Sequence, residues 1–144
     1  MRKHNFKGLH RTDGAPGYIW LMGEKIEGVW LEGDLLCNPK TNTACIVQHT
    51  DNGDVVLEVI PETVCESTGM TDRNGIEVFE NDVCRFYSDE GEHSDYCVHW
   101  DEKNCRYVVD MIGEEVPCDE LDDFFCENCI VIGSVWMHRK EETA

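Results

Sequence analysis

The chain lacks long hydrophobic runs: in its 144 residues no apolar stretch approaches the roughly 18 residues that a membrane-spanning helix needs. Its basic N-terminal stretch is not followed by the apolar segment of a secretory signal. These two absences predict an intracellular protein, located in the cytoplasm, that makes no contact with a membrane.

The chain also lacks the short motifs that mark common enzymes. It has no phosphate-binding P-loop, no G-x-G-x-x-G and no G-x-S-x-G, and none of its histidines forms H-x-x-x-H or H-E-x-x-H. Asp34 and Asp82 could be imagined as paired carboxylates, but both follow a Gly or Asn at an expected bend, which favours turn chemistry. We therefore predict no enzyme activity and no cofactor. A site assembled from residues distant in the sequence is an open alternative.

Positive charge is scarce, since 12 Lys and Arg stand against 30 Asp and Glu, for a net charge of −18. Between Arg106 and Arg139 there is no Lys or Arg. Such an acidic half repels phosphate, so we expect it not to bind DNA directly and to prefer a basic partner. The simpler alternative is that the charge only keeps a small protein soluble. The candidate partner-binding residues are Glu114, Glu115, Asp119, Glu120, Asp122 and Asp123.

Nine cysteines are many for this length, and an odd number cannot pair completely within one chain. Without an oxidising compartment we expect most of them to be reduced thiols. The segment Cys126-Glu127-Asn128-Cys129 is the only C-x-x-C, whereas a structural zinc site commonly uses two such pairs. We predict packing thiols rather than a metal site. Metal binding by Cys126 and Cys129 stays open, because distant ligands could complete a site: Cys97, His99, Cys105 or Cys118.

Closely spaced turn signals predict a mainly β protein. Asp51-Asn52-Gly53 indicates a hairpin with a type I′ turn, Gly33 a bend between two strands, and Pro61 the end of a strand. The best helix candidate covers residues 117–126, with a proline in its first turn and acids near its start. Many short strands with at most one helix favour a small barrel or sandwich. The predicted core is Trp20, Trp30, Leu35, Ile46, Val56, Val78, Val83, Val98, Trp100, Val108, Ile132 and Val135.

One short pattern occurs twice, as Leu31-Glu32-Gly33-Asp34-Leu35-Leu36 and as Phe79-Glu80-Asn81-Asp82-Val83-Cys84. In both copies Gly or Asn can adopt a left-handed backbone, and the following Asp can accept hydrogen bonds from nearby N–H groups. We therefore expect a bend at each copy, followed by a strand that enters the core.

Three blocks between residues 60 and 83 resemble the signature of YopX-like proteins of phages and prophages. They read I-P-E-T-V, T-G-M-T-D-R-N-G and V-F-E-N-D-V, with Asn81 where the family usually has Gly. Matching blocks occur in order outside them: W-L-E-G-D-L from Trp30, V-H-W-D from Val98 and I-V-I-G-S-V from Ile130. The resemblance implies a bacterial phage or prophage origin and no particular biochemical activity.

The resemblance also implies a fold and its division. We expect a mainly β protein, with an SH3-like small barrel in the C-terminal half, an N-terminal β extension and one short helix. The expected parts are an N-terminal β region at 1–65, the barrel at 66–137 and a flexible tail at 138–144, with the first two forming one compact unit.

Together these observations favour a non-catalytic protein-interaction module with an acidic recognition face, acting on a basic or nucleic-acid-binding host protein. A sharper alternative is an acidic DNA mimic that inhibits a host defence system, of the anti-restriction or anti-CRISPR type. A third hypothesis is a DNA-associated regulator that uses the basic arm, residues 2–11. The sequence does not specify an oligomeric state.

Overall fold

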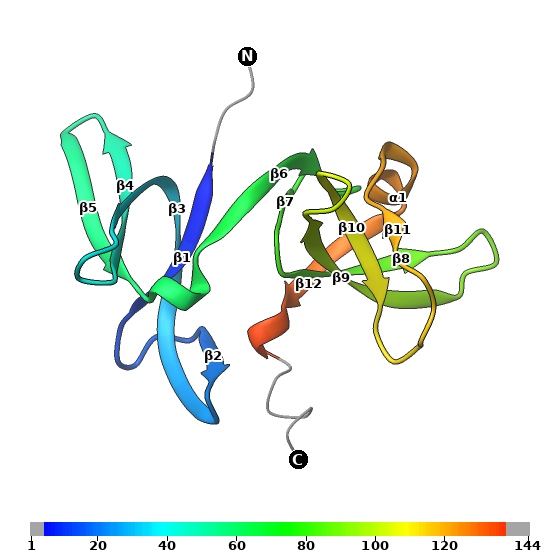
Figure 1. Ribbon diagram of the computed structural model, residues 1–144, viewed down its shortest axis with the longest axis horizontal. Coiled ribbons are helices and arrows are strands. Elements are labelled where there is room, and N and C mark those ends of the chain that lie inside the picture. Colours follow the sequence, from blue (N-terminus) through cyan, green and yellow to red (C-terminus); the bar gives the residue numbers. More distant parts are fainter. Residues whose placement is uncertain (1–4, 138–144) are drawn as a thin grey trace. The chain divides into compact units, whose positions relative to one another are not determined.

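The computed structural model describes residues 5–137, which form a mainly β protein with antiparallel strands, two 3-10 turns and one short α-helix (Figure 1). The chain divides into two compact units. The first unit holds the residues up to Ser67 together with Trp136 and Met137, and the second holds residues 68–135. From the sequence we expected one compact unit, with its two β regions meeting between residues 65 and 66. The expected flexible tail, 138–144, and the start of the basic arm, 2–4, lie outside the described residues. No helix in residues 5–137 has the length and apolar character to cross a membrane.

The first unit is built around β3 (Glu24–Asn38). Its successive parts pair with β2 (Tyr18–Leu21), β1 (Phe6–Arg11) and β4 (Thr43–Thr50), and β4 pairs in turn with β5 (Gly53–Val59). A 3-10 turn, η1 (Pro61–Thr63), follows β5. A second, η2 (Val135–Met137), ends the described chain.

Thr63 explains why the I-P-E-T-V block is needed at the end of β5. Its side chain is fully buried, and Oγ1 accepts a hydrogen bond from the N–H of Leu9 at 2.9 Å while donating to the carbonyl of Ile60 at 2.6 Å. Pro61 begins the 3-10 turn that presents this hydroxyl. The block therefore fastens the end of β5 to β1.

The bend expected at Gly33 is wrong, because β3 continues through it. A side chain at Gly33 would place its Cβ 2.3 Å from the carbonyl oxygen of Val47, so this glycine is required for the close approach of β4. Asp34 is exposed on the strand and does not make the local turn contacts expected of it. The two copies of the repeated pattern thus have different structures.

The hairpin expected at Asp51-Asn52-Gly53 is confirmed, with Thr50 opposite Gly53 in the β4–β5 register. Its expected turn type is wrong. Only Gly53 has a positive φ, of 112°, whereas a type I′ turn would need positive φ at Asp51 and Asn52. The glycine therefore supplies the left-handed residue that follows the turn.

The second unit is a five-stranded antiparallel sheet in the order β11-β10-β9-β8-β12. The strands are β8 (Asp82–Tyr87), β9 (His93–Asp101), β10 (Arg106–Met111), β11 (Asp119–Glu120) and β12 (Cys129–Ser134). The unit also contains the end of β6 (Cys65–Thr71), which pairs with β7 (Glu77–Phe79). Within residues 68–135 no pairing joins β11 to β12, so these strands do not close into the expected barrel.

The helix expected over residues 117–126 is wrong in extent. The helix α1 (Asp123–Glu127) is much shorter, and Asp122 is its N-cap, since Oδ1 accepts a hydrogen bond from the N–H of Phe125 at 2.9 Å. The preceding residues are held in the sheet instead, because Leu121 donates its N–H to the carbonyl of Tyr107. Proline at 117 therefore precedes a strand, not a helix.

The core of the second unit contains four of the expected residues, Val78, Val83, Val98 and Val108, all with at most 2% of their surface exposed. Ile46 is equally buried in the first unit. Two assignments to the core are wrong: Val56 is 51% exposed on the edge strand β5, and Trp100 is 40% exposed. Trp100 packs edge-to-face on Tyr107, opposite it on β10. Trp20, Trp30, Leu35, Ile132 and Val135 are only partly buried.

Two buried aspartates organise the turns of the second unit. Oδ1 of Asp72 accepts the N–H groups of Asn74 and Ile76, at 2.8 and 2.9 Å, and Oδ2 accepts that of Val131 at 2.9 Å. Oδ2 of Asp82 accepts the N–H of Phe79 at 2.8 Å. Asn81 has φ of 70°, so the left-handed bend expected there is confirmed. The T-D-R-N-G and F-E-N-D-V blocks therefore specify the fold.

Candidate recognition site

The six candidate partner-binding residues lie along the segment from the end of β10 to the first residue of α1, and all six are exposed. Asp119 and Glu120 form the edge strand β11, paired with Val109 and Val108 of β10. Asp122 caps α1, and Asp123 is the first residue of that helix. Figure 1 shows β11 leading directly into α1 within the second unit. The local fold thus holds Asp119 and Glu120 on the edge strand and Asp122 at the start of the helix.

Three of these acids share a cavity with four aromatic rings. The cavity has a volume of about 400 Å³ and is lined by Phe86, Tyr96, Asp119, Glu120, Asp122, Phe124 and Phe125. Cavities of this size commonly bind small groups through an apolar floor and a few polar side chains. The structure therefore joins part of the acidic segment to an aromatic surface.

The aromatic part is built from two strands and the helix. Phe86 on β8 and Tyr96 on β9 are diagonal neighbours, since Cys84 is opposite Tyr96 and Phe86 is opposite Ser94. The ring of Phe86 stacks on that of Phe125 at 5.3 Å and lies 6.0 Å from that of Phe124. Phe125 is buried, but Phe124 is 67% exposed. Phe124 therefore adds an accessible aromatic ring to the cavity.

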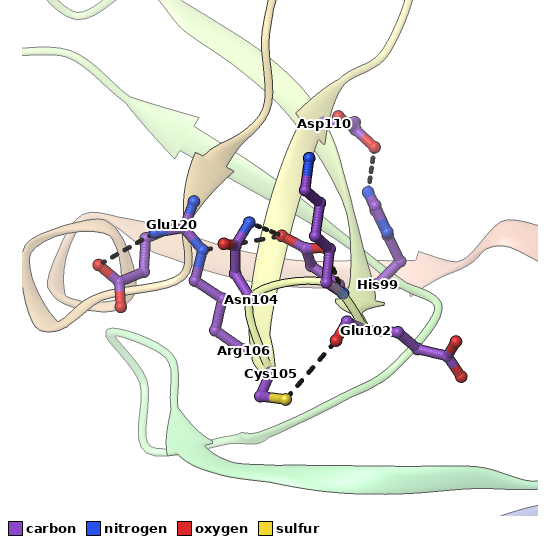
Figure 2. Close-up of polar contacts among 9 residues, drawn as sticks. His99, Glu102, Asn104, Cys105, Arg106, Asp110 and Glu120 are labelled. Atoms are coloured by element: carbon purple, nitrogen blue, oxygen red, sulfur yellow. Dashed lines mark hydrogen bonds and ion pairs between the residues drawn. The ribbon is translucent and has the colours of Figure 1, made fainter.

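The electrostatics of the cavity favour a cation. Burial, and the neighbouring carboxylate of Asp119, raise the pKa of Tyr96, so its hydroxyl stays neutral at physiological pH. Arg106 forms a long ion pair with Glu120. Its Nη1 lies 3.9 Å from Oε2 of Glu120, which is beyond hydrogen-bond distance (Figure 2). Glu120 is thus only weakly neutralised.

The Nε atom of Arg106 also lacks a close partner in the described residues. It lies 3.9 Å from Oδ2 of Asp101, is buried and has no hydrogen-bond partner in the described chain. Asp101 instead accepts a hydrogen bond from the side chain of Asn104 at 2.8 Å, which, with other local contacts, lowers its pKa. Figure 2 also shows His99 directed at Asp110, outside this cavity.

The structure separates the other three candidates from the cavity. Glu114 and Glu115 lie in the loop after β10 and do not line it. Asp123 lines a different cavity, of about 440 Å³, beside Arg73 and Glu127. The sequence therefore identified the acidic segment but not which of its carboxylates face a common space.

The four aromatic residues were missed as site residues. One local signal was available: Phe124 and Phe125 are adjacent on a short helix, and neighbouring helical positions cannot both face the same core. Phe86 and Tyr96 had no such signal, because only the β8–β9 register brings them to the helix.

The cysteines of the C-x-x-C segment lie in the core of the second unit. Cys84, Cys126 and Cys129 are buried together with Val78 and Val98. Hydrogen bonding to Cys129 and burial raise the pKa of Cys126. The hydrogen bond with Cys126 lowers the pKa of Cys129, but the hydrogen bond with Cys84 and burial raise it by more, so that the pKa of Cys129 is raised to about 12. No group of three or more potential ligands in residues 5–137 has an arrangement suited to a metal ion.

This burial predicts the pattern of thiol reactivity. At neutral pH, iodoacetamide should modify the exposed Cys37, Cys105 and Cys118 rapidly, because the thiolate is the reactive form and access is open. Cys126 and Cys129 should react only after unfolding in urea. Peptide mass mapping against time measures both rates, and rapid modification of Cys126 in the native protein would contradict the buried arrangement.

A second polar cluster lies on the first unit, where His49 bridges two aspartates. Its Nε2 is 2.6 Å from Oδ2 of Asp34 and its Nδ1 is 2.7 Å from Oδ1 of Asp54. These hydrogen bonds, that of Asp34 first, raise the pKa of His49. The three side chains are all more than half exposed, so salt screens the interaction.

A raised histidine pKa has a defined consequence for stability. The bridge contributes fully below the unfolded-state pKa of about 6.5 and is lost as pH rises through the folded-state value. In an NMR titration, His49 should titrate above that reference. Asp34→Asn should lower its pKa, whereas Asp51→Asn in the adjacent turn should change it less. Equal effects of the two substitutions would show that the hydrogen bond to Asp34 is not formed.

The protein is mainly β, has two compact units and carries an aromatic cavity lined in part by carboxylates. The YopX protein family model matches residues 24–138, which is most of the chain. The chain therefore belongs to the YopX protein family, as the resemblance of its sequence blocks predicted.

Among curated proteins none matches the chain. A solved structure, the crystal structure of protein EF1440 from Enterococcus faecalis, is 12% identical, with a TM-score of 0.49, and the alignment covers 98% of this chain and 99% of that one.

Proposed function

We propose that the protein is a phage- or prophage-encoded, non-catalytic interaction module that binds a basic protein of the bacterial cytoplasm through its second unit. The observation that carries the proposal is the cavity that Asp119, Glu120 and Asp122 line together with an exposed Phe124. As a finer proposal, the antiparallel order of the second unit supports an SH3-like arrangement.

The composition of the cavity supports binding rather than catalysis. Interfaces gain most of their affinity from a few aromatic anchors, surrounded by polar groups that fix orientation. Phe124 can be such an anchor because its ring is exposed while Phe125 holds the helix in the core. The carboxylates around it select for positive charge and accelerate encounter with a basic surface.

The proposal is tested by capture from bacterial lysate with two matched double variants. Asp119→Asn with Glu120→Gln removes two charges at the cavity, and Glu114→Gln with Glu115→Gln removes two charges from the same acidic segment away from it. A partner captured by the wild type and the second variant, but not by the first, supports the proposal. Capture that is retained by both variants, or lost equally in both, contradicts it.

The DNA-mimic hypothesis is a narrower form of this proposal, and the net charge of −18 favours it. Here the partner would use its nucleic-acid groove to bind the acidic face. Double-stranded DNA should then displace the captured partner in proportion to concentration, and binding should weaken steeply with salt. Displacement by a basic peptide but not by DNA would instead indicate a partner surface unrelated to nucleic acid.

A further inference from the structure

We infer that the cavity of the second unit selects an arginine side chain of the partner, with the guanidinium group stacked on Phe124 and paired with the rim carboxylates. This inference rests on the proposed function, because it specifies the chemistry of the residue that enters the same site. It commits the site to one guest, chosen by the charge and shape of the residues that line it.

Phe124 presents a flat, accessible ring. It is 67% exposed, and its ring lies 6.0 Å from that of Phe86, which in turn stacks on Phe125. A planar guanidinium stacks on such a ring through both cation–π attraction and surface contact. A lysine ammonium is a compact, strongly hydrated charge that must lose more water to make the same approach.

The acceptors beside the ring are carboxylates. Asp119 lies on the edge strand β11, on the same sheet face as Tyr96, and Asp122 is fixed by its capping bond through Oδ1. Glu120 follows Asp119 on the strand, so its side chain lies on the other face, toward Arg106. Carboxylates accept two parallel hydrogen bonds from a guanidinium, a geometry that an ammonium cannot match. Rigid acceptors add specificity because less side-chain freedom is lost on binding.

The described chain places none of its own cations in the cavity. Arg106 lies 3.9 Å from Glu120, on the other face of β11 from Asp119, and neither an arginine nor a lysine is among the residues that line the cavity. A partner arginine would supply the positive charge that the lining residues lack.

The test uses two small probes, N-acetylarginine N-methylamide and N-acetyllysine N-methylamide, titrated into the isotope-labelled full-length protein by NMR. The arginine probe should cause saturable shifts concentrated at Phe86, Tyr96, Asp119, Glu120 and residues 121–125. The lysine probe should bind about fivefold more weakly, since it lacks stacking and the bidentate pair.

Two variants separate a site from general attraction to an acidic protein. The shifts should disappear with Asp119→Asn plus Glu120→Gln and persist with Glu114→Gln plus Glu115→Gln. Equal affinity for both probes would overturn the selection of arginine while leaving the proposed function intact. Shifts spread over all acidic surfaces, or absent from the cavity, would also overturn the inference, whereas the lysate experiment independently decides whether this face binds a protein.

Discussion

Asp72→Ala is expected to lower the free energy of unfolding of the second unit by about 3–5 kcal/mol, because three N–H groups lose a charged acceptor. Asp72 is only 6% exposed, so water cannot fully replace its carboxylate. One of the three bonds joins Val131, 59 positions away, and therefore ties β12 to the turn after β6. Loss of this residue should loosen both segments together.

Asp72→Asn provides a graded comparison. The amide oxygen can still accept from Asn74 and Ile76, but its NH₂ group would face the N–H of Val131, where two donors repel. Asp72→Asn should lower the free energy of unfolding by less than Asp72→Ala does. Asp89→Asn, on an exposed turn, controls for the change in net charge. Urea unfolding followed by the NMR signals of residues 68–135 measures all three; a cost below about 1 kcal/mol for alanine would contradict the assigned role.

Phe124→Ala is expected to weaken binding of the captured partner by more than about tenfold while changing stability little, because an exposed anchor contributes mainly to the interface. Phe124→Leu should recover only part of the affinity, since it restores apolar bulk but not the flat ring. Calorimetric titration with the purified partner gives both affinities. An unchanged affinity for Phe124→Ala would remove the aromatic part of the proposed site.

Phe125→Ala is the matched control for this prediction. Phe125 is 7% exposed and belongs to the core with Leu121 and Cys126. Its truncation should cost about 3–5 kcal/mol in stability through the cavity that it leaves. The two neighbouring phenylalanines should thus differ in stability, with Phe125→Ala lowering it strongly and Phe124→Ala changing it little. Similar stability losses for both would show that Phe124 also packs in the core.

Local sequence signals predicted the turns of the second unit well. Asn81 and Asp82 form the expected bend, because a left-handed residue followed by a carboxylate is satisfied by neighbouring N–H groups. The same pattern failed at Gly33 and Asp34, where β1 and β4 pair with β3 on either side of this point and keep it extended. Long-range pairing, which a single sequence does not display, decided between the two outcomes.

The site was predicted only in its charged part for a similar reason. The acidic segment is contiguous in sequence, but the aromatic floor joins β8, β9 and α1 through strand register and helix packing. The expected helix over residues 117–126 also hid the edge strand that positions Asp119 and Glu120. Its acids and proline fit a helix start, yet backbone pairing with β10 held the chain extended as far as Leu121.

The most direct test of the account is the affinity of the captured partner for the two charge-matched double variants, measured by calorimetry at low and at physiological salt. The account predicts that Asp119→Asn with Glu120→Gln weakens binding more than about tenfold at both salt concentrations, because contacts at the cavity are lost. Glu114→Gln with Glu115→Gln should weaken it less than about threefold, and mainly at low salt. Equal losses in the two variants would show that net charge, and not the aromatic cavity, accounts for recognition.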